Sequence, residues 1–187
     1  KLALQSKEDV EQLHSHALLG PNSFMLEMLG DDSGKLDDRV AASKAFMETA
    51  ATVDATLSGT ELIVDVTSEA GHKFPTAFPS RRAWIHVTAK DASGAVIFES
   101  GGYDDRTGRI NGADKDELSV EPHHDVISDP NNVQIYESFL GTSEDEPTTT
   151  LLYGTHYVKD NRLLPAGFDA AKLDIDEKDV APVGDAA

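Results

Sequence analysis

The chain of 187 residues is strongly acidic, with 34 Asp and Glu against 16 Lys and Arg and a formal net charge of −18. This charge repels nucleic acid and anionic lipid and attracts cations, so we set nucleic-acid functions aside. The chain has no cysteine, which excludes disulfides, thiolate metal sites, iron–sulfur clusters and covalently attached haem. No apolar run approaches the roughly 18 residues of a membrane-spanning helix.

Residues 1–55 are predicted to form a helical segment that packs on the main domain. Ser6 followed by acidic residues is typical of a helix start, and apolar residues then recur at helical spacing up to Leu18. A Gly-Pro pair ends this helix. Two further helices are predicted over 23–29 and 37–54, because both stretches carry apolar side chains at helical spacing.

The hydrophobic period changes to two near residue 55, which indicates strands. A turn of sequence Asp-Ala-Ser-Gly is typical of a hairpin. Short strands between turn clusters favour a mainly β fold, an antiparallel β-sandwich-like domain over 56–168. The acidic, alanine-rich residues 169–187 are predicted to form an extended tail. Strands are predicted over 61–66, 83–89, 95–99, 133–139 and 151–158.

The seven histidines are candidate metal ligands. His14 and His16 lie two apart on a predicted helix, so their side chains point about 200° apart and do not easily share an ion. Trp84 and His86 also lie two apart, but on a predicted strand, where such residues project to the same face. The only tryptophan is therefore expected beside an imidazole.

Three further histidines are candidates to join His86, namely His123 and His124 in a predicted loop and His156 in the last predicted strand. Antiparallel pairing can bring such residues together, and two or three imidazoles suit copper or zinc. The structural alternative is that Trp84 is the core aromatic residue and His86 is a neighbour with satisfied hydrogen bonds.

An acidic loop offers a second kind of metal site, because Asn111, Asp114, Asp116 and Glu117 place many oxygen atoms in one short stretch. Calcium prefers oxygen ligands, but the spacing is not that of an EF-hand. A structural calcium ion and an ordinary acidic hairpin loop both stay open. Since the nucleophile-elbow, P-loop, zinc-protease and dinucleotide-binding motifs are absent, no enzyme activity is expected.

Several motifs resemble, in the same order, a segment near the C-terminal end of multihaem c-type cytochromes. The resemblance covers most of the chain from about residue 14 to residue 168. The haem-attachment motif of those cytochromes is absent, because the chain has no cysteine. The matching motifs are 71–76 (GHKFPT), 79–86 (PSRRAWIH), 122–127 (PHHDVI), 133–138 (VQIYES) and 159–165 (KDNRLLP).

A haemless version of this domain is similar to the MopE/CorA-type methanotroph surface proteins, which bind copper(I). The resemblance implies a mononuclear site of two histidines and a kynurenine, which forms by oxidation of a tryptophan two residues before the first histidine. Trp84 and His86 match that arrangement, and His156 is favoured over His124 and His123 as the second histidine. The implied role is copper acquisition by a secreted or cell-surface protein of a Gram-negative bacterium, associated with its outer membrane.

The chemistry explains why such a modification is needed. An indole N–H is only a donor, so Trp84 as encoded cannot ligate a metal. Opening the pyrrole ring leaves an aromatic amine with an available lone pair. Two neutral imidazoles and this weak amine favour low-coordinate Cu(I) without thiolates.

Two other hypotheses remain open at this point. The first is a haemless, cytochrome-related interaction domain that docks onto a redox partner and uses its histidines structurally. The second is a calcium-stabilised adhesion or scaffold module. The copper content of the protein from its native source separates the copper hypothesis from both.

Overall fold

The computed structural model describes residues 19–30, 33–76, 79–169, 172 and 183–184. The chain divides into two compact units, Lys1–Ala50 and Ala51–Ala187. The helix predicted to end at Leu18 lies outside the described residues, and so do His14 and His16. Within the described ranges, no helix is long and apolar enough to cross a membrane.

The described part of the first unit contains two helices, α1 (Phe24–Leu29) and α2 (Lys35–Met47). An ion pair of 3.0 Å between Lys44 Nζ of α2 and Glu27 Oε1 of α1 links them. The helix predicted over 23–29 is therefore present. The one predicted over 37–54 is present but ends earlier, at Met47.

The predicted helix was too long because β1 (Ala51–Ser58) begins where the helical pattern was thought to continue. Thr52 and Val53 pair with Thr67 and Val66 of β2 (Glu61–Ser68) in an antiparallel hairpin. Their β-branched side chains favour a strand. A partner strand further along the chain therefore overrides the local helical spacing.

The β1–β2 hairpin has one apolar and one polar face, because successive residues of a strand point to opposite sides. Val53 faces Val66, and Leu57 faces Leu62, all on the apolar side. Leu57 keeps 72% of its surface exposed. The hairpin thus presents an apolar face that no described residue of the second unit buries completely.

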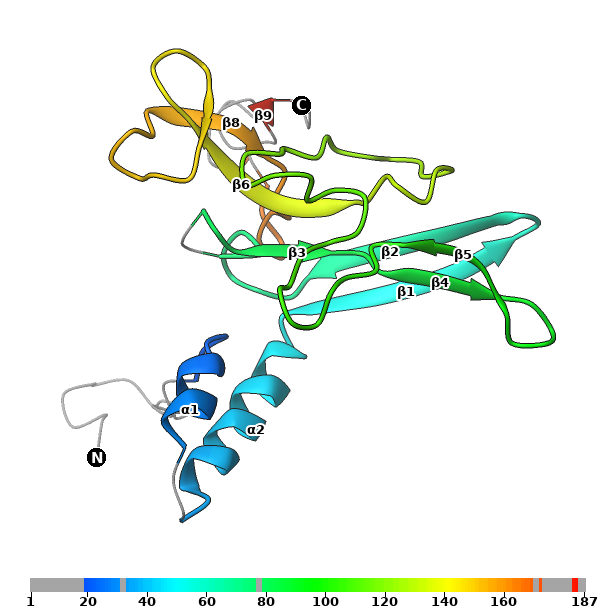
Figure 1. Ribbon diagram of the computed structural model, residues 1–187, viewed down its shortest axis with the longest axis horizontal. Coiled ribbons are helices and arrows are strands. Elements are labelled where there is room, and N and C mark those ends of the chain that lie inside the picture. The colour runs from blue at the N-terminus through cyan, green and yellow to red at the C-terminus, as the bar shows by residue number, and fades with distance from the viewer. Residues whose placement is uncertain (1–18, 31–32, 77–78, 170–171, 173–182, 185–187) are drawn as a thin grey trace. The chain divides into compact units, whose positions relative to one another are not determined.

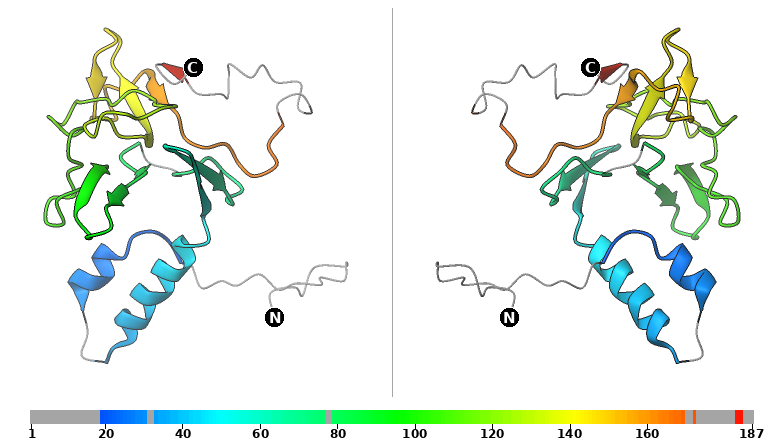
Figure 2. Two further views of the ribbon diagram at one scale, coloured as in Figure 1. Left: turned by 90° about the vertical axis from the view of Figure 1, so that its right-hand side faces the viewer. Right: turned by 90° about the vertical axis from the view of Figure 1, so that its left-hand side faces the viewer.

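The second unit is built around a sheet with the order β3-β6-β8-β9, in which β7 also pairs with β6. A separate hairpin pairs β4 with β5. The β1–β2 and β4–β5 hairpins overlap in Figure 1, and Figure 2 shows them apart. The predicted mainly β, antiparallel, sandwich-like fold with N-terminal helices is confirmed. The strands are β3 (Arg82–Trp84), β4 (Val87–Lys90), β5 (Val96–Ser100), β6 (Ile135–Gly141), β7 (Pro147–Thr148), β8 (His156–Asp160) and β9 (Val183–Gly184).

The hydrophobic core of the second unit is small and lies at the start of β6. Val133 and Ile135 are fully buried there, together with Ile110 and Ala113 of the preceding loop, and Trp84 packs against this cluster. The alternative expectation, that Trp84 is an aromatic residue of the core, is therefore confirmed. Any functional role of the indole must coexist with this packing.

Polar side chains make up much of the remaining buried interior, and three of them are charged, Glu137, Lys159 and Asp160. Lys159 is 1% exposed and donates through Nζ to Glu137 Oε1 at 2.9 Å and to the Ile135 carbonyl at 3.1 Å. Asp160 accepts hydrogen bonds from Lys73 Nζ at 2.8 Å and from Arg162 Nε at 2.7 Å. Buried charges persist in proteins when they are paired in this way.

Candidate functional site

Trp84 and His86 lie at a break between two strands. The strand predicted over 83–89 is divided into β3, which ends at Trp84, and β4, which begins at Val87. β3 pairs with β6, and Ile85 N–H continues this pairing by donating to the Gln134 carbonyl at 3.1 Å. β4 pairs instead with β5. His86 therefore stands where the chain leaves one sheet for the other.

The β4–β5 turn determines which side chain meets His86. Asp91 Oδ1 accepts hydrogen bonds from Ser93 N–H at 2.8 Å and from Ala95 N–H at 3.0 Å, a geometry typical of an Asx turn. This turn sets the register of the hairpin, in which Thr88 faces Glu99. Since His86 precedes Thr88 by two residues, Glu99 lies diagonally across from it.

The imidazole of His86 meets the Glu99 carboxylate directly. His86 Nε2 lies 2.9 Å from Glu99 Oε1 and 3.4 Å from Thr88 Oγ1. The side chains of His86 and Glu99 are 39% and 48% exposed. A nitrogen atom and an oxygen atom that can both ligate a metal ion therefore lie together at a surface that solvent and ions reach.

Tyr103 connects this pair with the tryptophan. Its ring centroid lies 5.5 Å from that of Trp84 and 6.2 Å from that of His86, and both contacts are edge-to-face. Such contacts each stabilise by about 0.5–1.5 kcal/mol beyond the buried area. Trp84, His86, Glu99 and Tyr103 form one group of side chains, which we name the Trp84 cluster.

Two glycines allow the backbone to approach the Trp84 cluster closely. Trp84 Nε1–H donates to the Gly101 carbonyl at 2.9 Å. Gly101 has a φ of 76°, and a Cβ atom there would lie 2.3 Å from the Ile85 carbonyl oxygen. A Cβ on Gly102 would lie 3.0 Å from Glu99 Oε1. Only the position of Gly101 therefore requires glycine, because the Glu99 carboxylate can shift away from a Cβ atom at residue 102.

The sequence predicted half of the Trp84 cluster. Trp84 and His86 are close as expected, although a shared partner rather than a continuous strand joins them. Glu99 and Tyr103 were missed, and the available signal was the position of Glu99 near the end of a predicted hairpin strand that follows His86. Among the described residues, no group of three or more His, Asp or Glu side chains is placed to hold a metal ion.

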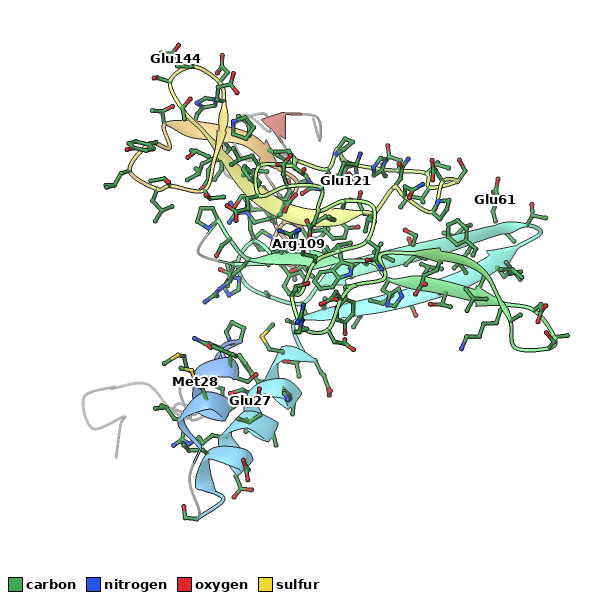
Figure 3. The ribbon with its side chains drawn as sticks, viewed as in Figure 1. Glu27, Met28, Glu61, Arg109, Glu121 and Glu144 are labelled. Atoms are coloured by element: carbon green, nitrogen blue, oxygen red, sulfur yellow. The ribbon has the colours of Figure 1, made fainter. Side chains whose placement is uncertain are left out.

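His156 lies in a different part of the sheet. Its backbone pairs with Gly141 at the far end of β6, whereas Trp84 pairs with Ile135 at the near end. The two pairs are six residue steps apart along β6, which is about 20 Å of strand. His156 Nε2 instead lies 3.2 Å from Asp145 Oδ1, near the loop that carries Glu144 in Figure 3. The prediction that His86 and His156 together bind one copper ion is therefore wrong, because one ion cannot reach both side chains.

His124 is occupied in the segment that precedes β6. Its Nε2 lies 2.9 Å from Oε1 of Glu121, which is labelled in Figure 3, and its backbone N–H donates to Gln134 Oε1 at 2.7 Å. Val133 N–H donates to the same Glu121 oxygen at 3.2 Å. These bonds hold the segment against β6, and they do not bring His124 into the Trp84 cluster.

His123 belongs to the same network. Its Nδ1 lies within 2.8 Å of Gln134 Nε2 and 3.1 Å of Asn161 Nδ2. Amide nitrogens only donate, so Nδ1 accepts and the proton of the neutral ring is on Nε2. That nitrogen lies 3.4 Å from Asp125 Oδ1. Like His124, His123 fixes the loop and does not approach His86.

In the acidic loop of residues 111–117, Asp114 lies against Arg82. Arg82 Nη1 donates to Asp114 Oδ1 at 2.6 Å, and Ile110 N–H donates to Oδ2 at 2.7 Å. Although burial acts to raise the pKa of Asp114, these hydrogen bonds outweigh it and the pKa is lowered. Asp116 Oδ1 accepts from Leu118 N–H at 2.8 Å. Internal donors thus take both carboxylate oxygens of Asp114 and one of the two of Asp116.

Comparison with known proteins adds no relative. No protein-family model, no curated protein and no solved structure matches the chain. Functional conclusions therefore depend on the residues and their geometry.

Proposed function

We propose that this protein binds copper as cargo at the Trp84 cluster and serves copper acquisition outside the cell. The observation that carries the proposal is the contact between the His86 imidazole and the Glu99 carboxylate, 2.9 Å apart and exposed, beside the only tryptophan. Imidazole is a good ligand for copper. The net charge of −18 favours the approach of any cation.

The oxidation state depends on Trp84. With the encoded indole, the Trp84 cluster offers one imidazole and one carboxylate, and a carboxylate suits Cu(II) better than Cu(I). Oxidation of the indole to kynurenine would add an aromatic amine close to the Gly101 carbonyl, since Trp84 Nε1 lies 2.9 Å from that oxygen. Two nitrogen ligands then favour Cu(I).

The oxidation of Trp84 to kynurenine needs dioxygen and water and proceeds in two steps. Dioxygen cleaves the Cγ–Cδ1 bond of the indole and adds one oxygen atom to each carbon. Water then removes the terminal carbon as formate and leaves the kynurenine amine. The side chain loses one carbon and gains one oxygen, a mass increase of about 4 Da.

The decisive experiment uses protein purified from its native source. Copper per chain is measured together with the mass of the peptide that contains Trp84. The expected result is one copper ion per chain and a gain of about 4 Da at Trp84. Recombinant protein with unmodified Trp84 is the comparison sample, and it should bind Cu(II) but hold Cu(I) more weakly. Native protein that lacks copper and does not bind it on addition would overturn the proposal.

A second candidate function is a haemless interaction domain that docks onto a redox partner. The apolar face of the β1–β2 hairpin favours it, because Val53, Leu57 and Leu62 are 63%, 72% and 47% exposed. Exposed apolar groups of this kind often mark protein interfaces. Leu57→Lys should abolish partner binding and leave copper binding unchanged, whereas His86→Ala should do the reverse if copper is the cargo.

A further inference from the structure

A cavity of about 260 Å³ lies in the second unit, outside the Trp84 cluster. Its walls come from three strands, from the turn at Pro79 and Ser80 before β3, and from the turn after β7. Among its lining residues are Arg82 of β3, Glu137 and Phe139 of β6, Thr148 of β7, and Thr149 and Leu151 of the turn that follows β7.

The sheet register explains why polar and apolar groups meet in this cavity. Arg82 pairs with Glu137 across β3 and β6, so their side chains lie beside each other on one face. Phe139 follows Glu137 by two residues and projects to the same face. One surface of the sheet therefore offers a charged pair next to an aromatic ring.

The charges around the cavity compensate one another. Glu137 Oε1 accepts from Lys159 Nζ at 2.9 Å. Arg82 donates to both carboxylate oxygens of Asp114. Two cations therefore face two anions, and no net charge is left to attract an ionic ligand.

One hydrogen-bond acceptor in the cavity is still available. The Glu137 side chain is 9% exposed, and in the part of the chain that the structure describes its Oε2 accepts no hydrogen bond. Since no described side-chain oxygen without a hydrogen-bond partner is fully buried, Oε2 stays accessible and can accept a hydrogen bond from an outside donor. Because Glu137 lines the cavity, a bound molecule can supply that donor.

We propose that this cavity binds a neutral, polyhydroxylated molecule with an apolar face, of the pyranose sugar class. Sugar hydroxyls can donate to Glu137 Oε2, and they can both donate to and accept from the hydroxyls of Thr148 and Thr149. The C–H face of the ring can pack on Phe139 and Leu151, which supply the apolar lining typical of small-molecule sites. The volume is below that of a pocket for a drug-sized ligand, which suits one sugar ring.

The proposal is tested by titrating the full-length protein with glucose, galactose and N-acetylglucosamine, followed by saturation-transfer NMR. Thr149→Trp fills the cavity from an exposed position. Thr150→Trp is the matched control, because Thr150 is an exposed neighbour that does not line the cavity. We expect millimolar binding of at least one sugar, weakened at least about tenfold by Thr149→Trp and unchanged by Thr150→Trp.

Three outcomes would overturn the proposal. They are the absence of binding for all three sugars, equal binding by the Thr149→Trp and control variants, and binding of choline without binding of any sugar. Circular dichroism verifies the fold of each variant. If Thr149→Trp does not fold, Leu151→Trp repeats the test, because Leu151 is 47% exposed and lines the same cavity.

Discussion

Gly101 lies so close to Ile85 that a Cβ atom on Gly101 would be 2.3 Å from the Ile85 carbonyl oxygen. The same residue has a φ of 76° and accepts the hydrogen bond of the Trp84 indole. Gly101→Ala should therefore lower the free energy of unfolding by about 2–4 kcal/mol, since strain at positive φ and a backbone clash add. Urea unfolding measures the loss.

A matched control separates the clash from the effect of the backbone angle. Gly108 has a φ of 69°, but a Cβ atom there would meet nothing within 4 Å. Gly108→Ala should cost only about 1–2 kcal/mol, and it should leave the fluorescence of Trp84 unchanged. Equal losses in the two variants would show that the clash of the new Cβ atom with Ile85 adds no cost in unfolding free energy.

The buried pair of Lys159 and Glu137 gives a second prediction. Lys159→Met removes the cation that lies 2.9 Å from Glu137 Oε1 and leaves a nearly buried carboxylate without compensation. The expected cost in unfolding free energy is about 3–5 kcal/mol. Adding Glu137→Gln to Lys159→Met should recover part of this loss, because the double variant has no uncompensated charge. A double variant less stable than Lys159→Met would contradict this explanation.

Asp160 should make the stability of the protein depend on pH in the acidic range. Burial acts to raise its pKa, but hydrogen bonds from Arg162 and Lys73 outweigh burial, so the pKa is lowered in the folded state. A lowered carboxyl pKa stabilises the fold above the unfolded value of about 4, and this contribution is lost as pH falls through the folded value. Asp160→Asn should therefore reduce the dependence of unfolding free energy on pH below about pH 4. An unchanged dependence would exclude Asp160 as a major contributor.

The sequence predicts the local parts of this fold better than the parts that depend on distant pairing. The Asp91 turn is encoded by residues within five positions, and it was predicted. The break at Ile85 was not, because it depends on a hydrogen bond to Gln134, which is far along the chain. The start of β1 at Ala51 was missed for the same reason, since pairing with β2 determines it.

The Trp84 cluster follows the same pattern. The proximity of Trp84 and His86 follows from their spacing alone. The contribution of Glu99 depends on the hairpin register, and that of Tyr103 depends on the turn through Gly101 and Gly102, so neither follows from a motif. His156 was expected to be a copper ligand, but it pairs with the end of β6 that is far from Trp84. The family resemblance that suggested His156 gives no information about how the strands are aligned.

Tyr103 should hold the Trp84 and His86 rings in place. Tyr103→Leu removes both edge-to-face contacts and should cost about 1–2 kcal/mol in unfolding free energy. It should also change the emission of Trp84, the only tryptophan in the chain. Tyr103→Phe keeps the ring and should retain most of the stability and the emission. A similar change in both variants would assign the effect to the hydroxyl group instead.

The copper proposal leads to a prediction that distinguishes among the histidines. His86→Ala removes the only imidazole of the Trp84 cluster, so copper affinity should fall by at least about 100-fold, more than the loss of an outer contact gives. Glu99→Gln keeps the shape but removes the charge, and it should weaken Cu(II) more than Cu(I), because carboxylates suit the harder ion.

His156→Ala and His124→Ala are the controls. His156 contacts Asp145, and His124 contacts Glu121, so neither variant should change copper affinity, although His124→Ala should lower the unfolding free energy. Competition with chromophoric chelators, one for Cu(I) and one for Cu(II), measures all four variants under the same conditions. Loss of binding in His156→Ala with retention in His86→Ala would show that copper binds at the Asp145 end of β6 and would end the assignment of the site to the Trp84 cluster.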